Sequence, residues 1–196
     1  MEKVYFWCYL MYTDINQCYH VIQGAVEDKM IDKIINQGES VKLAECKLDN
    51  QGITPARKSK VSFIKNKRIE NLMSFYVMQA NRDKEWMYYI TDIEDFQYTV
   101  YNKGDYYNWH IDKGQIYPNR RERKISFSLI LNDDYKGGQL EFGMTTPKDN
   151  KDDYVVLDLK KGDMVVFTSF LWHRVNPVIE GIRKSLVGWI VGPCFK

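Results

Sequence analysis

Several features that mark common protein classes are scarce or missing in this chain of 196 residues. It has four cysteines but no C-x-x-C pair and no zinc-site spacing, so we expect reduced, buried thiols. The apolar segment at residues 4–12 is too short to span a membrane and has no small-residue cleavage site. We therefore expect a strand there, and a cytoplasmic protein without a membrane partner. The cysteines are Cys8, Cys18, Cys46 and Cys194.

Linkers and a strong net charge are also missing. The sequence has no internal repeat, no low-complexity tract and no linker rich in Pro, Gly or Ser, so it predicts one domain over residues 1–196. A net charge of +2 excludes a general binder of polyanions. Two local basic stretches are interpreted as solvated loops and strand edges: Arg57, Lys58, Lys60, Lys65, Lys67 and Arg68, and Arg120, Arg121, Arg123 and Lys124.

The composition that is present suits a β-rich globule, with 44% apolar and 14% aromatic residues. Apolar stripes predict helices at residues 26–37 and at about 67–80, with Gly38 ending the first. After Trp86, aromatic and β-branched runs between turn signals predict about eight strands. This order predicts a mainly β fold with flanking helices, a jelly roll braced on one side.

Two of the three histidines form a pattern with an aspartate, as His110-x-Asp112 and a distant His173. Two imidazoles and one carboxylate make the facial triad of non-haem Fe(II) oxygenases, which leaves three coordination positions open. His20 has no such pattern and is interpreted as structural. The sequence therefore predicts an iron site formed by His110, Asp112 and His173.

Strand alternation predicts which side chains share the site. Asn108 is expected on the face of His110, while Trp109 and Ile111 are expected to point the other way into a hydrophobic layer. Glu141 is expected to point outward and is not read as a fourth ligand.

Arg183 follows His173 by ten residues. A guanidinium can hold a buried carboxylate through two parallel hydrogen bonds. The same alternation places Ser185, Val187 and Trp189 on the face of Arg183.

The context of these residues resembles a known family. Tyr101 to Asp112 reads Y-x-x-G-x-x-Y-x-x-H-x-D, and the spacing from His173 to Arg183 also matches. From about residue 94 to 191 the chain resembles the prolyl-4-hydroxylase-like, PKHD-type branch of the Fe(II)/2-oxoglutarate dioxygenases. Residues 1–93 would then support this metal-binding core, and residues 57–63 and 81–86 resemble the family's leading strand and helix.

The resemblance implies a double-stranded β-helix that couples oxidative decarboxylation of 2-oxoglutarate to hydroxylation. It implies Fe(2+), 2-oxoglutarate as cosubstrate and O2, with ascorbate as an optional addition. Arg183 is expected to bind the C5 carboxylate of 2-oxoglutarate, with Tyr101 and Ser185 beside it. Tyr107 and Trp189 are expected to line the substrate pocket.

The substrate is the least determined part of this interpretation. The resemblance favours a proline in a protein or peptide, and a free amino acid or small metabolite is the alternative. The basic segment 113–122 is expected to form part of a lid over the substrate. Some prolyl hydroxylases carry a tyrosine that helps to hold the C5 carboxylate, where this chain has Ile130, so the full set of cosubstrate contacts is open.

Other classes fit the sequence less well. A nucleic-acid demethylase of the AlkB type carries a second arginine six residues after the first, where this chain has Trp189, so no nucleic-acid partner is expected. A halogenase of this fold would lack the carboxylate of Asp112. A non-catalytic jelly-roll module would not need this combination of residues.

Overall fold

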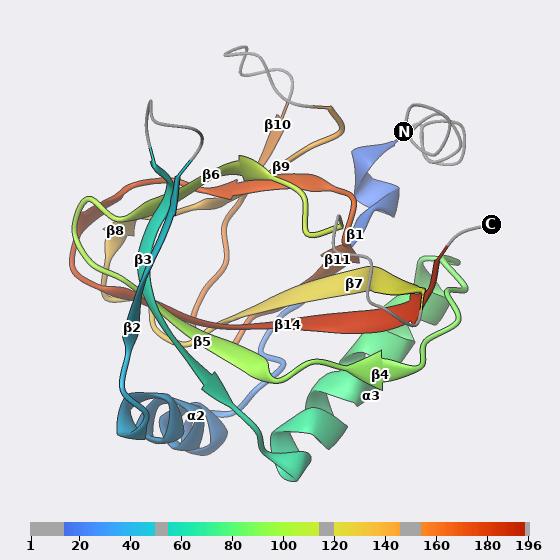
Figure 1. The fold of residues 1–196 in the computed structure, drawn as a ribbon, viewed down its shortest axis with the longest axis horizontal. Coiled ribbons are helices and arrows are strands. Elements are labelled where there is room, and N and C mark those ends of the chain that lie inside the picture. The colour runs from blue at the N-terminus through green and yellow to red at the C-terminus, as the bar shows by residue number, and fades with distance from the viewer. Residues whose placement is uncertain (1–13, 50–54, 114–119, 146–153, 195–196) are drawn as a thin grey trace.

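The computed structural model describes residues 14–49, 55–113, 120–145 and 154–194. The strand expected at residues 4–12 lies outside them. Antiparallel strands are the main regular structure of the described chain and curl into two facing layers, with two helices outside one layer (Figure 1). The elements that precede Trp86 are η1 (Ile15–Gln17), β1 (Tyr19–Ile22), α2 (Asp28–Ser40), β2 (Ala44–Asp49), β3 (Pro55–Ile64) and α3 (Lys67–Asp83).

Among the described residues, eleven strands follow Trp86, more than the eight or so expected. They are β4 (Asp92–Ile93), β5 (Phe96–Tyr101), β6 (Tyr106–His110), β7 (Arg121–Ile130), β8 (Lys136–Gly137), β9 (Leu140–Gly143), β10 (Tyr154–Leu157), β11 (Met164–Thr168), β12 (Trp172–Val175), β13 (Val178–Glu180) and β14 (Arg183–Pro193).

One sheet of twelve strands runs through both layers, in the order β1-β11-β7-β14-β5-β3-β6-β12-β9-β10, with β2 paired to β3 and β4 to β14. β8 and β13 form a separate pair. The long strand β3 belongs to both layers, because its residues from Lys60 to Ile64 pair with β5 while Arg57 and Lys58 pair with β6. The sheet therefore curls over on itself as a jelly roll, the fold class that the sequence predicted.

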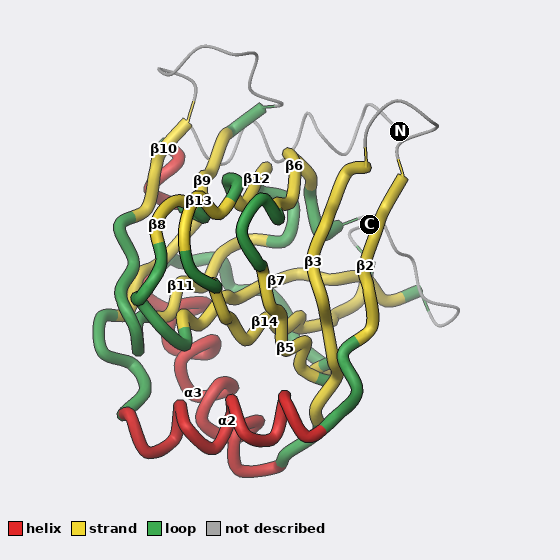
Figure 2. Tube along the Cα trace, turned by 90° about the vertical axis from the view of Figure 1, so that its left-hand side faces the viewer, coloured by secondary structure: helices red, strands yellow, loops and turns green. Residues whose placement is uncertain are grey.

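Two hydrophobic clusters match the two sides of the β7–β14–β5 layer. Ile125, Phe127 and Leu129 of β7 pack under the helices with apolar residues of α2 and α3. Figure 2 shows both helices on this outer side of the layer. The second cluster fills the space between the layers and contains Tyr101, Leu140, Phe142, Val165, Phe167, Leu171, Val175 and Val178. Ser126 and Ser128, which alternate with the apolar residues of β7, are therefore left to face the interior of the barrel.

The first helix runs past the glycine that was expected to end it. α2 continues to Ser40, and Gly38 lies buried within its last turn. A Cβ at position 38 would lie 2.3 Å from Cγ of Tyr98, so the absence of a side chain lets this ring of β5 pack directly against the helix. Gly38 is a packing residue here, and the prediction of a helix stop was wrong.

The second helix begins where the sequence predicted and ends at Asp83, slightly later. Asn66 caps its N-terminus by accepting hydrogen bonds from the backbone N–H groups of Arg68 and Ile69. Of the described helices, none combines the length and the apolar character that a membrane crossing requires.

Candidate iron and cosubstrate site

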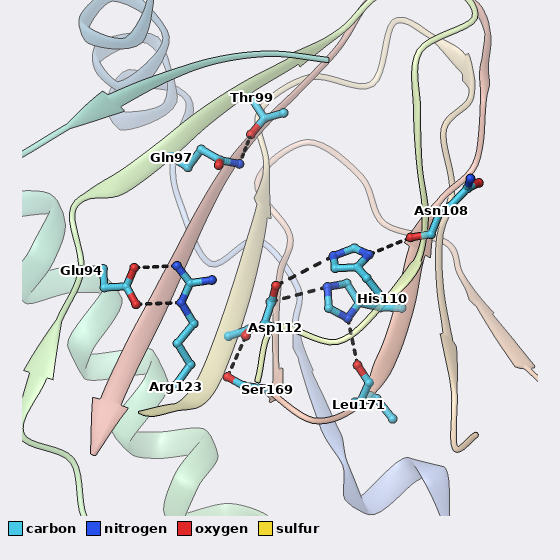
Figure 3. Close-up of polar contacts among 11 residues, drawn as sticks. Glu94, Gln97, Thr99, Asn108, His110, Asp112, Arg123, Ser169 and Leu171 are labelled. Atoms are coloured by element: carbon cyan, nitrogen blue, oxygen red, sulfur yellow. Dashed lines mark hydrogen bonds and ion pairs between the residues drawn. The ribbon is translucent and has the colours of Figure 1, made fainter. Parts of the chain in front are cut away.

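The three expected metal ligands lie together inside the barrel. His110 ends β6, His173 lies directly opposite it on β12, and Asp112 follows two residues after β6. Nε2 of His110 is 3.8 Å from Oδ1 of Asp112, and Nε2 of His173 is 3.5 Å from Oδ2 (Figure 3). One potential ligand atom of each residue lies within 4.8 Å of the others, the one cluster of this kind among the described residues.

Hydrogen bonds fix both imidazoles with the same nitrogen turned toward Asp112. Nδ1 of His110 donates to the carbonyl of Asn108 at 2.7 Å, and Nδ1 of His173 donates to the carbonyl of Leu171 at 2.9 Å (Figure 3). Because a carbonyl oxygen can only accept a hydrogen bond, Nδ1 of each ring carries the proton. In the neutral ring this leaves Nε2 with its lone pair. Such bonds orient histidines that bind metals.

The protonation states in this cluster also suit a divalent cation. Burial, helped by nearby His173, lowers the pKa of His110 to about 3, so its imidazole is neutral at physiological pH. Burial acts to raise the pKa of Asp112, but the two imidazoles together with hydrogen bonds from Ser126 and Trp189 hold this pKa below its usual range. Two imidazoles and one carboxylate therefore converge, which is the donor set that Fe(II) takes in a facial triad.

A β-bulge changes which neighbour shares the face of His110. Three residue steps on β6, from Tyr107 to His110, match two on β12, from Val175 to His173. Two residues thus oppose one, which brings Tyr107 onto the site face. Its ring stacks on that of His110 with centroids 3.5 Å apart, while the side chain of Asn108 is exposed. The expectation that Asn108 faces the site was wrong.

The reverse side of this strand also differs from the expectation of a hydrophobic layer. Trp109 packs edge-on against Tyr154, with the guanidinium of Arg174 4.7 Å over its ring. Arg174 also donates to Glu141 at 2.6 Å. Glu141 therefore lies on the outer face, away from the metal ligands, and is covered by an ion pair.

A cavity of about 190 Å³ extends from the metal ligands toward Arg183 on β14. Arg183 is 1% exposed, and its Nη1 donates to the hydroxyl of Ser185 at 3.0 Å. Its Cζ lies 5.4 Å from the ring centroid of Tyr101, and its Nε has no hydrogen-bond partner. No carboxylate of the described chain pairs with this guanidinium. A buried charge without a partner is costly, so this end of the cavity fits an anionic group such as the C5 carboxylate of 2-oxoglutarate.

A larger and more open hollow of about 470 Å³ lies on the other side of Arg183, where Ile130 and Tyr135 line it. None of the three clustered metal-binding residues reaches it. We therefore place the site in the smaller cavity. Ile130, which stands where some prolyl hydroxylases have a tyrosine, is 1% exposed and pairs with Ser185 across the β7–β14 ladder. Because isoleucine has no hydroxyl, it cannot replace that tyrosine as a hydrogen-bond donor to the cosubstrate.

Trp189 forms the wall near the cavity mouth, on the same strand face as Arg183, Ser185 and Val187. The guanidinium of Arg123 lies 3.9 Å over the Trp189 ring. Arg123 in turn donates two hydrogen bonds of 2.7 Å to Glu94 (Figure 3). This wall is held by an aromatic–cation stack and a bidentate ion pair.

Arg121, expected in a lid, and Arg123, interpreted as solvated, instead belong to strand β7. Arg121 pairs with Asp92, and Arg123 pairs with Glu94. Lys113 lies 3.8 Å from Glu122. Residues 114–119, which complete the expected lid, lie outside the described residues. The interpretation of these arginines as solvated or as lid residues was wrong, because strand pairing brings acidic partners of β4 and its neighbourhood beside them.

Sequence reasoning also missed residues of the site. Arg57 was interpreted as solvated but is 5% exposed and lines the cavity beside Tyr107. Ser126 and Ser169 are fully buried and share a hydrogen bond of 2.9 Å next to Asp112 (Figure 3). The alternation of Arg57 with Ser59 and Val61 along a strand was the available signal for Arg57. No local signal pointed to Ser169, which lies in a turn.

Comparison with solved structures defines the class of fold. The viral collagen prolyl hydroxylase of Paramecium bursaria Chlorella virus-1 superposes with a TM-score of 0.65 at 18% identity, over 89% of this chain and 96% of that one. A Pseudomonas putida prolyl-4-hydroxylase gives a TM-score of 0.62 at 20% identity, over 88% and 91% of the two chains. The fold is thus the jelly roll of the 2-oxoglutarate oxygenases.

Sequence comparison then gives the family. Residues 96–191 match the model of the 2OG-Fe(II) oxygenase superfamily. A PKHD-type hydroxylase of Rippkaea orientalis is 35% identical over 101 residues, which cover 50% of this chain and 43% of that protein. One of Synechococcus sp. CC9902 is 36% identical over 89 residues, 44% and 36% of the two chains. The chain spans less than half the length of these curated relatives.

The chain belongs to the 2OG-Fe(II) oxygenase superfamily. The predicted family is confirmed. The predicted cofactor and cosubstrates, Fe(II), 2-oxoglutarate and O2, are also confirmed. That one domain covers the whole chain, and that ascorbate assists, stay predictions.

Proposed function

We propose that this protein is an Fe(II)- and 2-oxoglutarate-dependent hydroxylase that acts on a proline of a protein or peptide. One observation carries the proposal: the cluster of His110, Asp112 and His173 opens into the same cavity as a buried arginine that lacks an acidic partner. When bound, Fe(II), 2-oxoglutarate and O2 supply oxidative decarboxylation of the cosubstrate and insertion of one oxygen atom into a substrate C–H bond.

The chain's own residues bind and orient these reactants. His110, Asp112 and His173 would hold the iron through two neutral nitrogens and one carboxylate, which leaves coordination positions for cosubstrate and O2. Arg183 would hold the C5 carboxylate, with the Ser185 hydroxyl accepting from Arg183 and donating to the carboxylate, and with Tyr101 beside them. Because Arg183 and Ser185 are both 1% exposed, water is excluded from this end, which strengthens the ion pair.

The proposal of a proline substrate rests on the aromatic lining of the cavity. Tyr107 and Trp189 line it together with the metal ligands, and aromatic side chains suit a pyrrolidine ring that brings no charge. Trp189 is fixed by the Arg123–Glu94 pair. The prolyl hydroxylases whose solved structures this fold resembles support this choice.

The experiment is reconstitution with Fe(II) and 2-oxoglutarate, followed by measurement of succinate formation and of one added oxygen atom in proline peptides by mass spectrometry. We expect succinate formation in the wild type and its loss in His110→Ala, Asp112→Ala and His173→Ala, each of which should still fold but bind Fe(II) far more weakly. If all three variants fail to fold, the residues are structural. Hydroxylation of free proline but of no peptide would show that the proposed substrate class is wrong. The proposed oxygenase activity would still hold.

A further inference from the structure

Arg57 is a buried cation in the cavity that the proposed reaction leaves unused. Its Nε donates to the hydroxyl of Ser59 at 2.8 Å, and its Cζ lies 4.7 Å from the ring centroid of Tyr107, the ring that stacks on His110. Its two terminal nitrogens make no hydrogen bond with a described residue, and no described carboxylate pairs with it. Since Arg57 is 5% exposed, this charge is withdrawn from water without an anion from the described residues beside it.

A second arginine, Arg174 of β12, stacks on an aromatic ring of β6 as Arg57 does, and it shows that the chain can supply such an anion. Arg174 lies 4.7 Å over the ring of Trp109, the same distance at which Arg57 lies over Tyr107. Glu141 accepts a hydrogen bond of 2.6 Å from Arg174. The arginine that faces outward is therefore neutralised by the protein, while Arg57, which faces the cavity, is not.

The formal charges of the residues that line the cavity sum to an excess of positive charge. Arg123 is neutralised by Glu94, which leaves the guanidiniums of Arg57 and Arg183 against the single carboxylate of Asp112. A divalent iron and a doubly charged 2-oxoglutarate add equal and opposite charges. With Arg183 taken by the cosubstrate, one positive charge remains, at Arg57 on the side of His110.

We propose that Arg57 binds a carboxylate of the substrate, so that the group to be hydroxylated lies next to an acidic residue or a free carboxyl end. This rests on the proposed function, because it assigns the cosubstrate to Arg183. The terminal nitrogens of Arg57 would donate two hydrogen bonds to the carboxylate. The stack on Tyr107 holds the guanidinium plane beside the iron ligand, which fixes the distance between the carboxylate and the reacting carbon.

Pools of short peptides test this without knowledge of the substrate sequence. One pool contains Pro with Asp and Glu in the randomised positions, and its matched pool contains Asn and Gln instead, all with acetylated and amidated ends. A third arm leaves the C-terminal carboxylate free in the neutral pool, and a fourth supplies free amino acids. Succinate formation and oxygen incorporation are measured with the wild-type protein, Fe(II) and 2-oxoglutarate. We expect the acidic pool or the free-carboxylate arm to be preferred over the neutral capped pool by about ten- to hundredfold, the range of a hydrogen-bonded charge pair.

Variants assign the preference to Arg57. Arg57→Gln should remove it by raising KM for the carboxylate-bearing peptides, while KM for 2-oxoglutarate stays at the wild-type value. Arg57→Lys should restore part of it, since a point charge remains. Arg174→Gln is the matched control, because it removes an equally stacked guanidinium from the outer face, and it should keep the preference.

The outcomes separate this inference from the proposed function. The role given to Arg57 is wrong if the wild type turns over 2-oxoglutarate with acidic and neutral peptide pools at the same rate. It is also wrong if Arg57→Gln weakens the binding of 2-oxoglutarate instead of the binding of the peptide. In both cases the proposed oxygenase activity still holds. If the wild type neither binds 2-oxoglutarate in the presence of Mn(II) nor forms succinate in any arm, the proposed function itself fails. A preference for free amino acids would mean that Arg57 binds the carboxylate of a free amino acid and not that of a peptide.

Discussion

The backbone N–H of Lys113 donates to the carbonyl of Ser169 at 2.8 Å, which ties the residue after Asp112 to the turn before His173. Ser169 in turn donates its N–H to the carbonyl of Lys124 at 3.0 Å, and its hydroxyl meets that of Ser126 at 2.9 Å. The same turn presents the carbonyl of Leu171 to Nδ1 of His173. One short turn between β11 and β12 thus supports two of the three metal ligands.

We expect Ser169→Ala to weaken Fe(II) binding by roughly tenfold, in the range seen when partners behind metal ligands are removed. The reason is that the Ser126 hydroxyl, which lowers the pKa of Asp112, loses the contact that orients it. Isothermal titration with Mn(II) or Co(II) measures this directly. Ser40→Ala, which removes a hydroxyl at the end of α2 far from the site, is the control. Equal metal affinity in both variants would show that the hydroxyl pair only fills space.

Arg183→Leu should leave the C5 carboxylate of 2-oxoglutarate buried without a partner. Breaking a buried pair in this way costs on the order of 3–5 kcal/mol, so the affinity for 2-oxoglutarate should fall by roughly a hundredfold or more. Metal binding should be nearly unchanged. Lys184→Leu is a suitable control, since Lys184 pairs with Glu39 on the helix side of the same strand. Wild-type dependence on 2-oxoglutarate in Arg183→Leu would refute the assignment.

The metal-free protein should lose stability as the pH falls from about 6.5 toward 3. Burial holds the pKa of His110 at about 3 in the folded state, while the unfolded chain binds this proton near pH 6.5, so the unfolded state gains protons first. Urea unfolding at pH values between 5 and 7 measures the slope above the carboxylate range. In His110→Leu the slope should be smaller. A slope that does not change would mean that His110 titrates normally.

Gly38→Ala should destabilise the fold although alanine is the better helix former. The added Cβ would lie 2.3 Å from Cγ of Tyr98, so either the ring or the helix must shift, at about 1–3 kcal/mol. Thermal unfolding measures this, and Tyr98→Leu should relieve most of the loss in the double variant. A gain in stability on Gly38→Ala alone would support the sequence-based interpretation of a simple helix end.

Regular strands allowed the sequence to predict the cosubstrate side of the site. From Arg183 to Trp189 the strand pairs without interruption, so simple alternation put four side chains on the correct face. The same rule failed at Tyr107 and Asn108, because the bulge depends on how β6 pairs with β12 and leaves no local mark. The metal ligands could be predicted because the short H-x-D pattern and the distant histidine lie in a longer context that resembles a known family; the spacing alone is common by chance.

Arg57 illustrates what a single sequence cannot give. Its neighbours along the chain are Lys58 and Lys60, so a basic strand edge was the simpler interpretation. Its burial arises only when β3 pairs with both β5 and β6, which sets Arg57 opposite Tyr107. Gly38 is similar, because its role depends on Tyr98, a residue far away in the chain that packs against the helix.

The strand shared by the two layers has a consequence for selectivity. The metal ligands come from β6, β12 and the residues just after β6, whereas Arg183 comes from β14 in the facing layer. β3 hydrogen-bonds to β5 beside β14 and to β6, and so fixes the gap between the layers. If the proposed function holds, the distance between the iron ligands and Arg183, and with it the length of dicarboxylate that can bridge them, depends on how the whole sheet curls and not on any one side chain in the pocket.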